Sequence, residues 1–111
     1  MDSELLKGTL SLLILSLLSR KPMYGYEIAA TVHRDTQGAF TWREGSLYPS
    51  LHKLEAGGLI QGQWEEKETG RKRRYYQVTK KGQAVLQEKL ESWSELCRAV
   101  NRVLESSDGQ A

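Results

Sequence analysis

Apolar residues recur in this chain at spacings that predict helices in its first half. Residues 5–19 are apolar on almost every side of a helix, so this segment should be covered from several directions. Residues 24–35 should form a second helix, in which Tyr24, Ile28 and Val32 fall at i, i+4 and i+8 and share one face. Proline cannot continue a helix, so Pro22 should break the chain between the two segments.

A third helix is predicted over residues 45–56, and its sides differ in chemistry. Leu47, Leu51 and Leu54 fall at i, i+4 and i+7, so they should face a core. Gly57-Gly58 should end this helix. The remaining sides carry hydrogen-bond donors and one cation, from Tyr48, Ser50, His52 and Lys53.

The starts of two helices carry residues that suit backbone capping. We expect Ser46 to cap the third helix, and Pro49 to lie in its first turn, where the missing N–H costs little. Thr79 should cap a last, long helix that runs to about Leu104. At 1.5 Å per residue, that helix would be roughly 36 Å long.

Two strands are predicted between the third and the last helix. They cover residues 60–66 and 72–78, are rich in Tyr and Trp, and are joined by the turn residues 67–70. The fold class that follows is mainly α with a small β-hairpin, arranged as a winged helix-turn-helix plus a C-terminal dimerisation helix.

The last helix carries an apolar seam with heptad-like spacing. Its members are Leu86, Leu90, Trp93, Cys97, Val100 and Leu104. A domain this small cannot cover so long a seam, and a large uncovered apolar stripe marks an interface, here between two copies of the chain. The alternative is that the seam packs only on the chain's own first helix.

Length and charge refine this organisation. A chain of 111 residues is one domain, in which residues 1–80 would bind DNA, 81–105 would dimerise and 106–111 would form a flexible tail. Net charge is only +2, but residues 71–81 hold six cations and no acid. Such polarisation is typical of a nucleic-acid footprint. A solvated hairpin edge protected by Lys and Arg is the alternative.

Composition argues against several other classes of protein. One cysteine excludes an internal disulfide, which fits a reducing, cytoplasmic location, and two histidines with one cysteine make no zinc site. The apolar run 9–18 is too short for a membrane span and lacks the flanks of a signal peptide. We see no phosphate loop, catalytic triad or cofactor motif, so we expect no enzyme and no cofactor.

Several motifs together resemble the PadR family of bacterial transcriptional regulators. They are Met23-Tyr24-Gly25-Tyr26-Glu27-Ile28, Gly45-Ser46-Leu47-Tyr48-Pro49, Leu54-Glu55 with Gly57-Gly58-Leu59-Ile60, Gly70-Arg71-Lys72-Arg73-Arg74-Tyr75-Tyr76 and Val78-Thr79-Lys80-Lys81-Gly82. They occur in family order over nearly the whole chain. The chain is similar to the small members with a single helix after the wing, which implies a homodimer on double-stranded DNA.

The expected DNA contacts lie on two elements. On the third helix they are Ser46, Tyr48, Pro49, Ser50 and Lys53, because the N-terminal part of a recognition helix meets base edges and phosphates. On the second strand they are Arg71, Lys72, Arg73 and Arg74, of which alternation lets about two per subunit face the duplex. Tyr48 has an alternative role, packing against the neighbouring helix.

A ligand site is suggested by Glu91-Ser92-Trp93-Ser94, which resembles the multidrug-binding members of the family. The resemblance implies that Trp93, with Cys97 and Leu12 nearby, binds a flat aromatic effector at the dimer interface. An aromatic on a seam is otherwise simply core. Cys97 departs from the acid that some drug binders carry there, and it could be inert or, paired with its symmetry mate, a redox sensor.

The function that follows is a repressor that binds a pseudo-palindromic operator as a homodimer and is released by a planar aromatic ligand. Two other classes stay open: a winged-helix module that binds protein, and a ligand sensor without sequence-specific DNA binding. The operator, the regulated gene and the effector cannot be inferred from the sequence.

Overall fold

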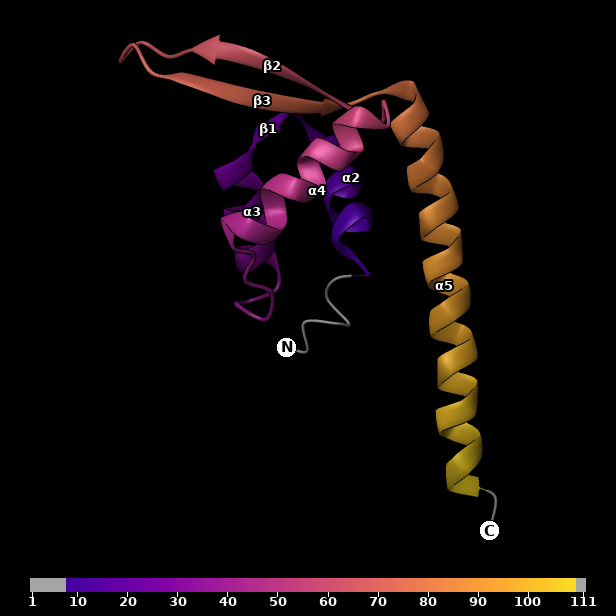
Figure 1. The fold of residues 1–111 in the computed structure, drawn as a ribbon. Coiled ribbons are helices and arrows are strands. Elements are labelled where there is room, and N and C mark those ends of the chain that lie inside the picture. The colour runs from indigo at the N-terminus through magenta and orange to yellow at the C-terminus, as the bar shows by residue number, and fades with distance from the viewer. Residues whose placement is uncertain (1–7, 110–111) are drawn as a thin grey trace.

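The computed structural model describes residues 8–109, which form four helices and a three-stranded antiparallel sheet (Figure 1). The elements are α2 (Leu10–Arg20), β1 (Met23–Tyr24), α3 (Gly25–Asp35), α4 (Glu44–Ala56), β2 (Ile60–Glu66), β3 (Lys72–Val78) and α5 (Lys80–Gly109). The predicted winged helix-turn-helix followed by one long helix is confirmed. The wing is the hairpin of β2, β3 and the turn 67–70.

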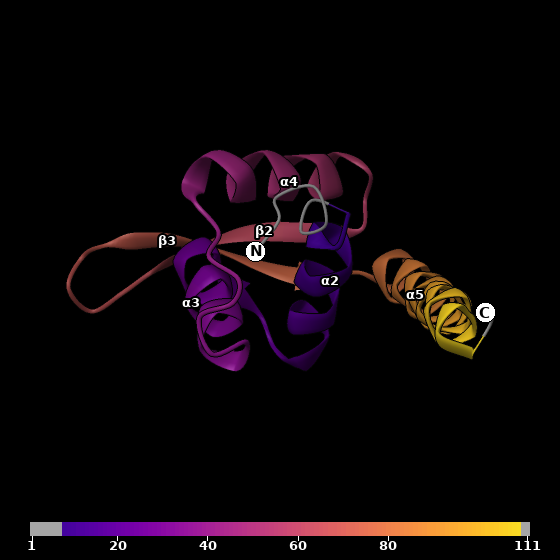
Figure 2. The same ribbon diagram turned by 90° about the horizontal axis from the view of Figure 1, so that it is seen from below.

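The elements are arranged with α2, α3 and α4 grouped at the base of the wing. In Figure 1 the free end of the wing reaches past these helices on one side, and α5 descends on the other. Seen from below, α5 is viewed nearly along its axis and most of it stands apart from the shorter helices (Figure 2). The molecule is therefore elongated, with principal extents of 66 × 29 × 21 Å.

The core lies where the three short helices meet the sheet. Leu15 of α2, Ile28 of α3 and Leu51 of α4 are fully buried there. Ile60 from β2 and Tyr76 from β3 close the core on the sheet side. Burial of these apolar side chains is the main stabilising contribution, at about 25 cal/mol per Å² of apolar surface.

A short strand precedes the second helix, which the sequence analysis did not predict. Met23 and Tyr24 pair with Tyr76 and Tyr75 of β3, so the sheet order is β1-β3-β2. Tyr24 has an extended backbone, and α3 therefore begins at Gly25 and not at Tyr24. This pairing joins segments far apart in the chain, which local periodicity cannot reveal.

The start of α4 differs from the prediction. The residue at the N-cap is Arg43, without a side-chain hydrogen bond, and Ser46 is already helical, its N–H donating to the Arg43 carbonyl at 3.0 Å. Pro49 lies inside the helix, beyond its first turn. The helix begins earlier than expected, so both the capping role of Ser46 and the first-turn position of Pro49 are wrong.

The end of α4 is confirmed, and it forms a Schellman motif. Gly58 has a φ of +76°, and its N–H donates to the Glu55 carbonyl at 3.0 Å. The Leu59 N–H donates to the Leu54 carbonyl, also at 3.0 Å. These two bonds satisfy carbonyls that a helix end leaves open, and glycine supplies the left-handed conformation without steric cost.

The start of α5 is joined directly to the end of α4. Thr79 caps α5 as predicted, because its Oγ1 accepts the Gly82 N–H at 3.0 Å, and it also donates to the Gly58 carbonyl at 2.7 Å. The Lys81 ammonium donates to the Gly57 carbonyl at 3.0 Å. A Cβ at buried Gly82 would overlap the Leu59 carbonyl oxygen, so this joint needs glycine.

The outer limits predicted for the first and the last helix are Leu5 and about Leu104. The start expected for the first helix, Leu5, lies outside the described residues. The last helix runs to Gly109 and does not end near Leu104, so the expected tail overlaps the helix from Ser106. This C-terminal extension is polar, and apolar periodicity therefore gave no sign of it.

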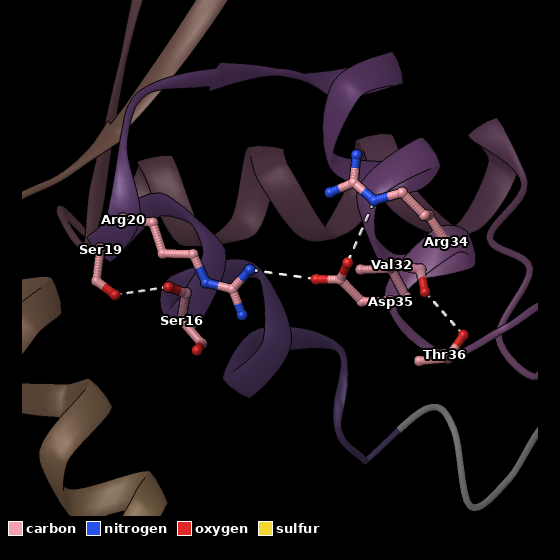
Figure 3. Close-up of polar contacts among 7 residues, drawn as sticks. All are labelled: Ser16, Ser19, Arg20, Val32, Arg34, Asp35 and Thr36. Carbon is pink, nitrogen blue, oxygen red and sulfur yellow. Dashed lines mark hydrogen bonds and ion pairs between the residues drawn. The ribbon is translucent and has the colours of Figure 1, made fainter.

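Polar contacts between α2 and α3 lie on the surface (Figure 3). Arg20 Nη1 donates to Asp35 Oδ2 at 3.2 Å, and Arg34 Nε approaches Asp35 Oδ1 at 3.3 Å. The hydrogen bond from Arg20 is the main reason that the pKa of Asp35 lies below its ordinary value. Exposed pairs of this kind contribute little to stability.

Candidate nucleic-acid interface

The buried and exposed sides of α4 divide as the leucine spacing predicts. Leu47, Leu51 and Leu54 are buried in the core. On the other sides, Ser46, Tyr48, Pro49, His52 and Lys53 are exposed and Ser50 is half-buried. The helix is held by its leucines and presents hydroxyl groups, an imidazole and one cation to solvent.

Tyr48 packs on α3, as the alternative role weighed from the sequence requires, and its DNA contact stays a prediction. Its ring packs on α3, since a Cβ at Gly25 would lie 3.1 Å from Tyr48 Cε1. The side chain nevertheless keeps 39% of its surface exposed. The absence of a side chain at Gly25 therefore lets the ring lie close to α3 while its outer part stays accessible.

Ser46 and Ser50 are linked on the exposed side of α4. The Ser50 hydroxyl donates to the Ser46 carbonyl at 3.1 Å. A hydroxyl that donates in this way keeps its oxygen lone pairs for a further donor. Pro49 lies between the two serines and offers no N–H.

A hollow of about 410 Å³ lies between α4 and the wing. Aromatic rings and cations line it together. Its lining residues are Tyr24, Gly25, Tyr48, His52, Trp64, Lys72, Arg73, Arg74 and Tyr76. Of the predicted DNA contacts, Tyr48 of α4 and Lys72, Arg73 and Arg74 of the wing line this hollow, whereas Ser46, Pro49, Ser50, Lys53 and Arg71 lie outside it.

The wing cations are held differently from one another. Arg71 and Lys72 are exposed. The Arg73 guanidinium lies 4.4 Å from the centre of the Tyr24 ring, where a cation–π contact orients it. On the same strand Arg74 forms an ion pair with Glu55, with 2.7 Å between Nη2 and Oε2.

Lys67, in the turn of the wing, is a further cation that the sequence analysis passed over. Its ammonium lies 4.7 Å from the centre of the Tyr75 ring, and the contact with the Tyr75 hydroxyl raises the pKa of Lys67. Tyr75 in turn meets the Tyr24 ring edge-on at 5.4 Å. This edge-on pair of tyrosines thus holds both Lys67 and Arg73 near the sheet.

The apolar stripe of α5 comprises Leu90, Trp93, Cys97, Val100 and Leu104. Leu86, which precedes it on the seam, is buried against the core. Beyond Leu86 the side chains are open, with 38% of Leu90, 44% of Trp93 and 47% of Val100 exposed. Cys97 is half-buried, and so is Leu12 on α2, which packs against the core cluster.

Residues 8–109 show neither a metal cluster nor a membrane-spanning helix. No three His, Cys, Asp or Glu side chains in this part of the chain gather as a metal ion would require. Among the same residues, no helix has both the length and the apolar character to cross a membrane.

Comparison with known proteins decides the family. Residues 14–88 match the model of the transcriptional regulator PadR-like family. The chain belongs to the PadR-like family. A transcriptional regulator from Clostridium thermocellum has a TM-score of 0.85 at 30% identity, over 92% of this chain and 96% of that one. A PadR-like regulator from Bacillus cereus has a TM-score of 0.78 at 35% identity, over 91% and 96%.

A curated relative supports the same assignment. The transcriptional regulator Rv3488 of Mycobacterium tuberculosis is 45% identical over 56 residues, which cover 50% of this chain and 51% of that protein. As a PadR-like regulator, this chain acts in DNA-binding regulation of transcription.

The roles of Glu55 and Gly62 were not predicted from the sequence, because the partner of Glu55 was not sought. From the sequence, Glu55 was recognised only as part of a family motif, and Gly62 only as a member of the predicted strand 60–66. An acid on a helix expected to meet DNA calls for a cation that neutralises it. That question would have directed attention to the basic strand.

Proposed function

We propose that this PadR-like protein is a repressor that binds a pseudo-palindromic operator as a homodimer. The observation that carries the proposal is the polar, lysine-bearing side of α4 beside the basic strand β3, with one hollow between them. A helix can enter the major groove of B-DNA, and a basic hairpin beside it can reach the neighbouring backbone.

The contacts divide between base edges and phosphates. Ser46, Tyr48, Pro49 and Ser50 belong to the N-terminal half of α4 and would approach base edges. Lys53, one turn further on, suits a phosphate or a guanine. On the wing, Arg71, Lys72 and Arg73 would bind phosphate or enter the minor groove.

The dimer would form through the apolar stripe of α5. Leu90, Trp93 and Val100 lie on one side of the helix and are open in the single chain. A second copy packed on this side would cover them in both subunits. Two α4 helices related by the dyad would then enter successive major grooves about 34–36 Å apart.

The effector would bind between Trp93 and the partner's Trp93. Near a dyad, two indoles can sandwich a planar aromatic ring, and a cationic ring gains further from cation–π attraction. Leu12 and Cys97 would line the same space. Release of the operator requires that the ligand prefer the dimer conformation that does not fit DNA, since equal affinity for both conformations shifts nothing.

Footprinting and salt-dependent binding test the proposal. We expect protection of a two-fold symmetric site, and a loss of affinity of roughly 10³–10⁵ between 50 and 200 mM salt if about 6–10 phosphates are contacted. Lys53→Ala and Arg73→Ala should weaken binding, whereas Arg102→Ala, on exposed α5 surface, is the matched control. Sequence-independent protection would leave only the protein-binding or ligand-sensing alternatives.

A further inference from the structure

One carboxylate oxygen connects α4 to both strands of the wing. Glu55 Oε2 accepts the backbone N–H of Gly62, on β2, at 3.1 Å. The same oxygen accepts Nη2 of Arg74, on β3, at 2.7 Å. Both side chains of the ion pair are about one-third exposed, at 29% for Glu55 and 32% for Arg74. The connection is therefore partly shielded from solvent and geometrically defined.

An acid at the position of Glu55 is unfavourable unless it has a partner. Glu55 lies in the last turn of α4, where the helix dipole disfavours negative charge. It also belongs to the helix proposed to approach phosphates, which would repel it. Arg74 supplies the compensating charge, and the short contact indicates a charge-assisted hydrogen bond.

Arg74 is fixed by more than the ion pair. Its side chain lies across Gly62, where an added Cβ would come within 2.5 Å of Arg74 Nε. The guanidinium carbon lies 5.7 Å from the centre of the Trp64 ring and 5.8 Å from that of Tyr76. These contacts direct the guanidinium at α4, which distinguishes it from the exposed Arg71 and Lys72.

We infer that Glu55 and Arg74 are positioning residues that fix the wing against α4, and so set how the helix and the wing reach the operator together. The inference revises the expectation that Arg74 itself contacts DNA, and it rests on the DNA binding proposed above. The glycine at position 62 belongs to the same arrangement, because its missing side chain makes room for Arg74.

The inference and a direct DNA contact predict opposite signs for Glu55→Gln. If Arg74 bound phosphate, removing an acid would free it and raise affinity for any DNA. If the pair positions the wing, Glu55→Gln lowers operator affinity about tenfold, the fold-change expected for losing one charge-assisted hydrogen bond. Binding to scrambled DNA, which needs no defined geometry, is kept or slightly strengthened.

The experiment is a double-mutant cycle on the full-length protein with labelled operator and scrambled duplexes. Glu55→Gln, Arg74→Gln and the double variant are compared by fluorescence anisotropy over a range of salt concentrations. We expect the double variant to lose no more operator affinity than either single variant. The slope of log affinity against log salt concentration should stay at the wild-type value in all three variants. The control Lys72→Gln should lower the magnitude of this slope by about 1 per subunit.

Gly62→Ala provides a test that leaves every charge in place. The added methyl group displaces Arg74 from Glu55 and should reproduce the tenfold operator loss with an unchanged salt slope. A gain in affinity for Glu55→Gln or Gly62→Ala, or a lowered slope for Arg74→Gln, would overturn the inference. Wild-type protein that does not distinguish operator from scrambled DNA would refute the proposed function instead, whatever the variants do.

Discussion

Two regions of the molecule differ in how their exposed side chains are held. One is the wing together with α4, and the other is the second half of α5. On the wing, each long cation except Arg71 and Lys72 is held by a ring or an acid of the same chain, as Arg73 is by Tyr24. On α5, Leu90, Trp93 and Val100 are apolar and remain open. The first surface is organised within one subunit, and the second has the character of half an interface.

This difference suggests that the two surfaces serve different kinds of binding. A preorganised polar surface loses little conformational entropy when it binds, which favours specificity. An apolar stripe gains free energy only when a second surface covers it. The two helices that carry these surfaces, α4 and α5, are connected where Thr79, Lys81 and Gly82 contact the end of α4.

The joint offers the strongest way to break the comparison. Gly82→Ala places a methyl group on the Leu59 carbonyl oxygen, and backbone on both sides resists the shift. We expect a loss of about 3 kcal/mol in the free energy of unfolding, measured with urea. Gly45→Ala is the control, because its added Cβ meets nothing within 4 Å and should stabilise the helix by about 0.5–1 kcal/mol. Equal stability of the two variants would contradict the proposed packing.

Leu90→Asp should disturb the α5 stripe while leaving the winged helix folded. A charge on the α5 stripe would be buried by a partner, so dimerisation should weaken by about 2–3 kcal/mol. Analytical ultracentrifugation at micromolar concentration checks this. Ser92→Asp, on exposed surface off the stripe, should stay dimeric. A wild-type protein that sediments only as a monomer would remove the dimer proposal.

Trp93→Ala sharpens the comparison within α5 itself. The variant should lose about 1 kcal/mol or more of affinity for planar cationic dyes, because an aromatic contact is removed. Operator binding without ligand should be kept, since Trp93 lies away from α4 and the wing. Dye titrations and gel shifts on the same samples measure both. Unchanged dye affinity would exclude Trp93 from the site.

Asp35→Asn should have the smallest effect of the four. Because the pKa of Asp35 is lowered in the folded state, its ion pairs stabilise the fold fully above the ordinary value of 3.8. That contribution is lost as pH falls through the lower, folded-state pKa. The variant should therefore melt slightly below wild type at pH 7, and the difference in melting temperature should close in strong acid. A gap that widens on acidification would contradict the direction of the shift.

Local signals were enough for the elements that local chemistry builds. The strand limits 60–66 and 72–78 are confirmed to the residue, because a run of strand formers on each side meets turn residues such as Gly70, at φ +82°. The leucine spacing likewise gave the correct buried side of α4. Periodicity and turn chemistry act over a few residues, so they can be recognised without knowing the fold.

Pairings between distant segments could not be predicted in this way. The strand β1 forms because Met23 pairs with Tyr76 of β3. The charge of Glu55, on α4, is neutralised because Arg74 of β3 forms an ion pair with it. Alternation alone made Arg74 equivalent to Lys72, since both belong to the same side of one strand. Only the position of α4 under the wing distinguishes them. The role of Tyr48 depended in the same way on the small residue opposite, Gly25.

The placement of the aromatic residues equips the molecule with its own optical probes. The chain has three tryptophans: Trp42 is buried in the core, Trp64 is exposed on the wing and Trp93 lies on the α5 stripe. Variants that retain one tryptophan at a time would each emit from a single region. Unfolding, DNA contact and subunit association could then be followed as separate shifts of the tryptophan emission wavelength in an unlabelled protein, at the concentrations where each event occurs.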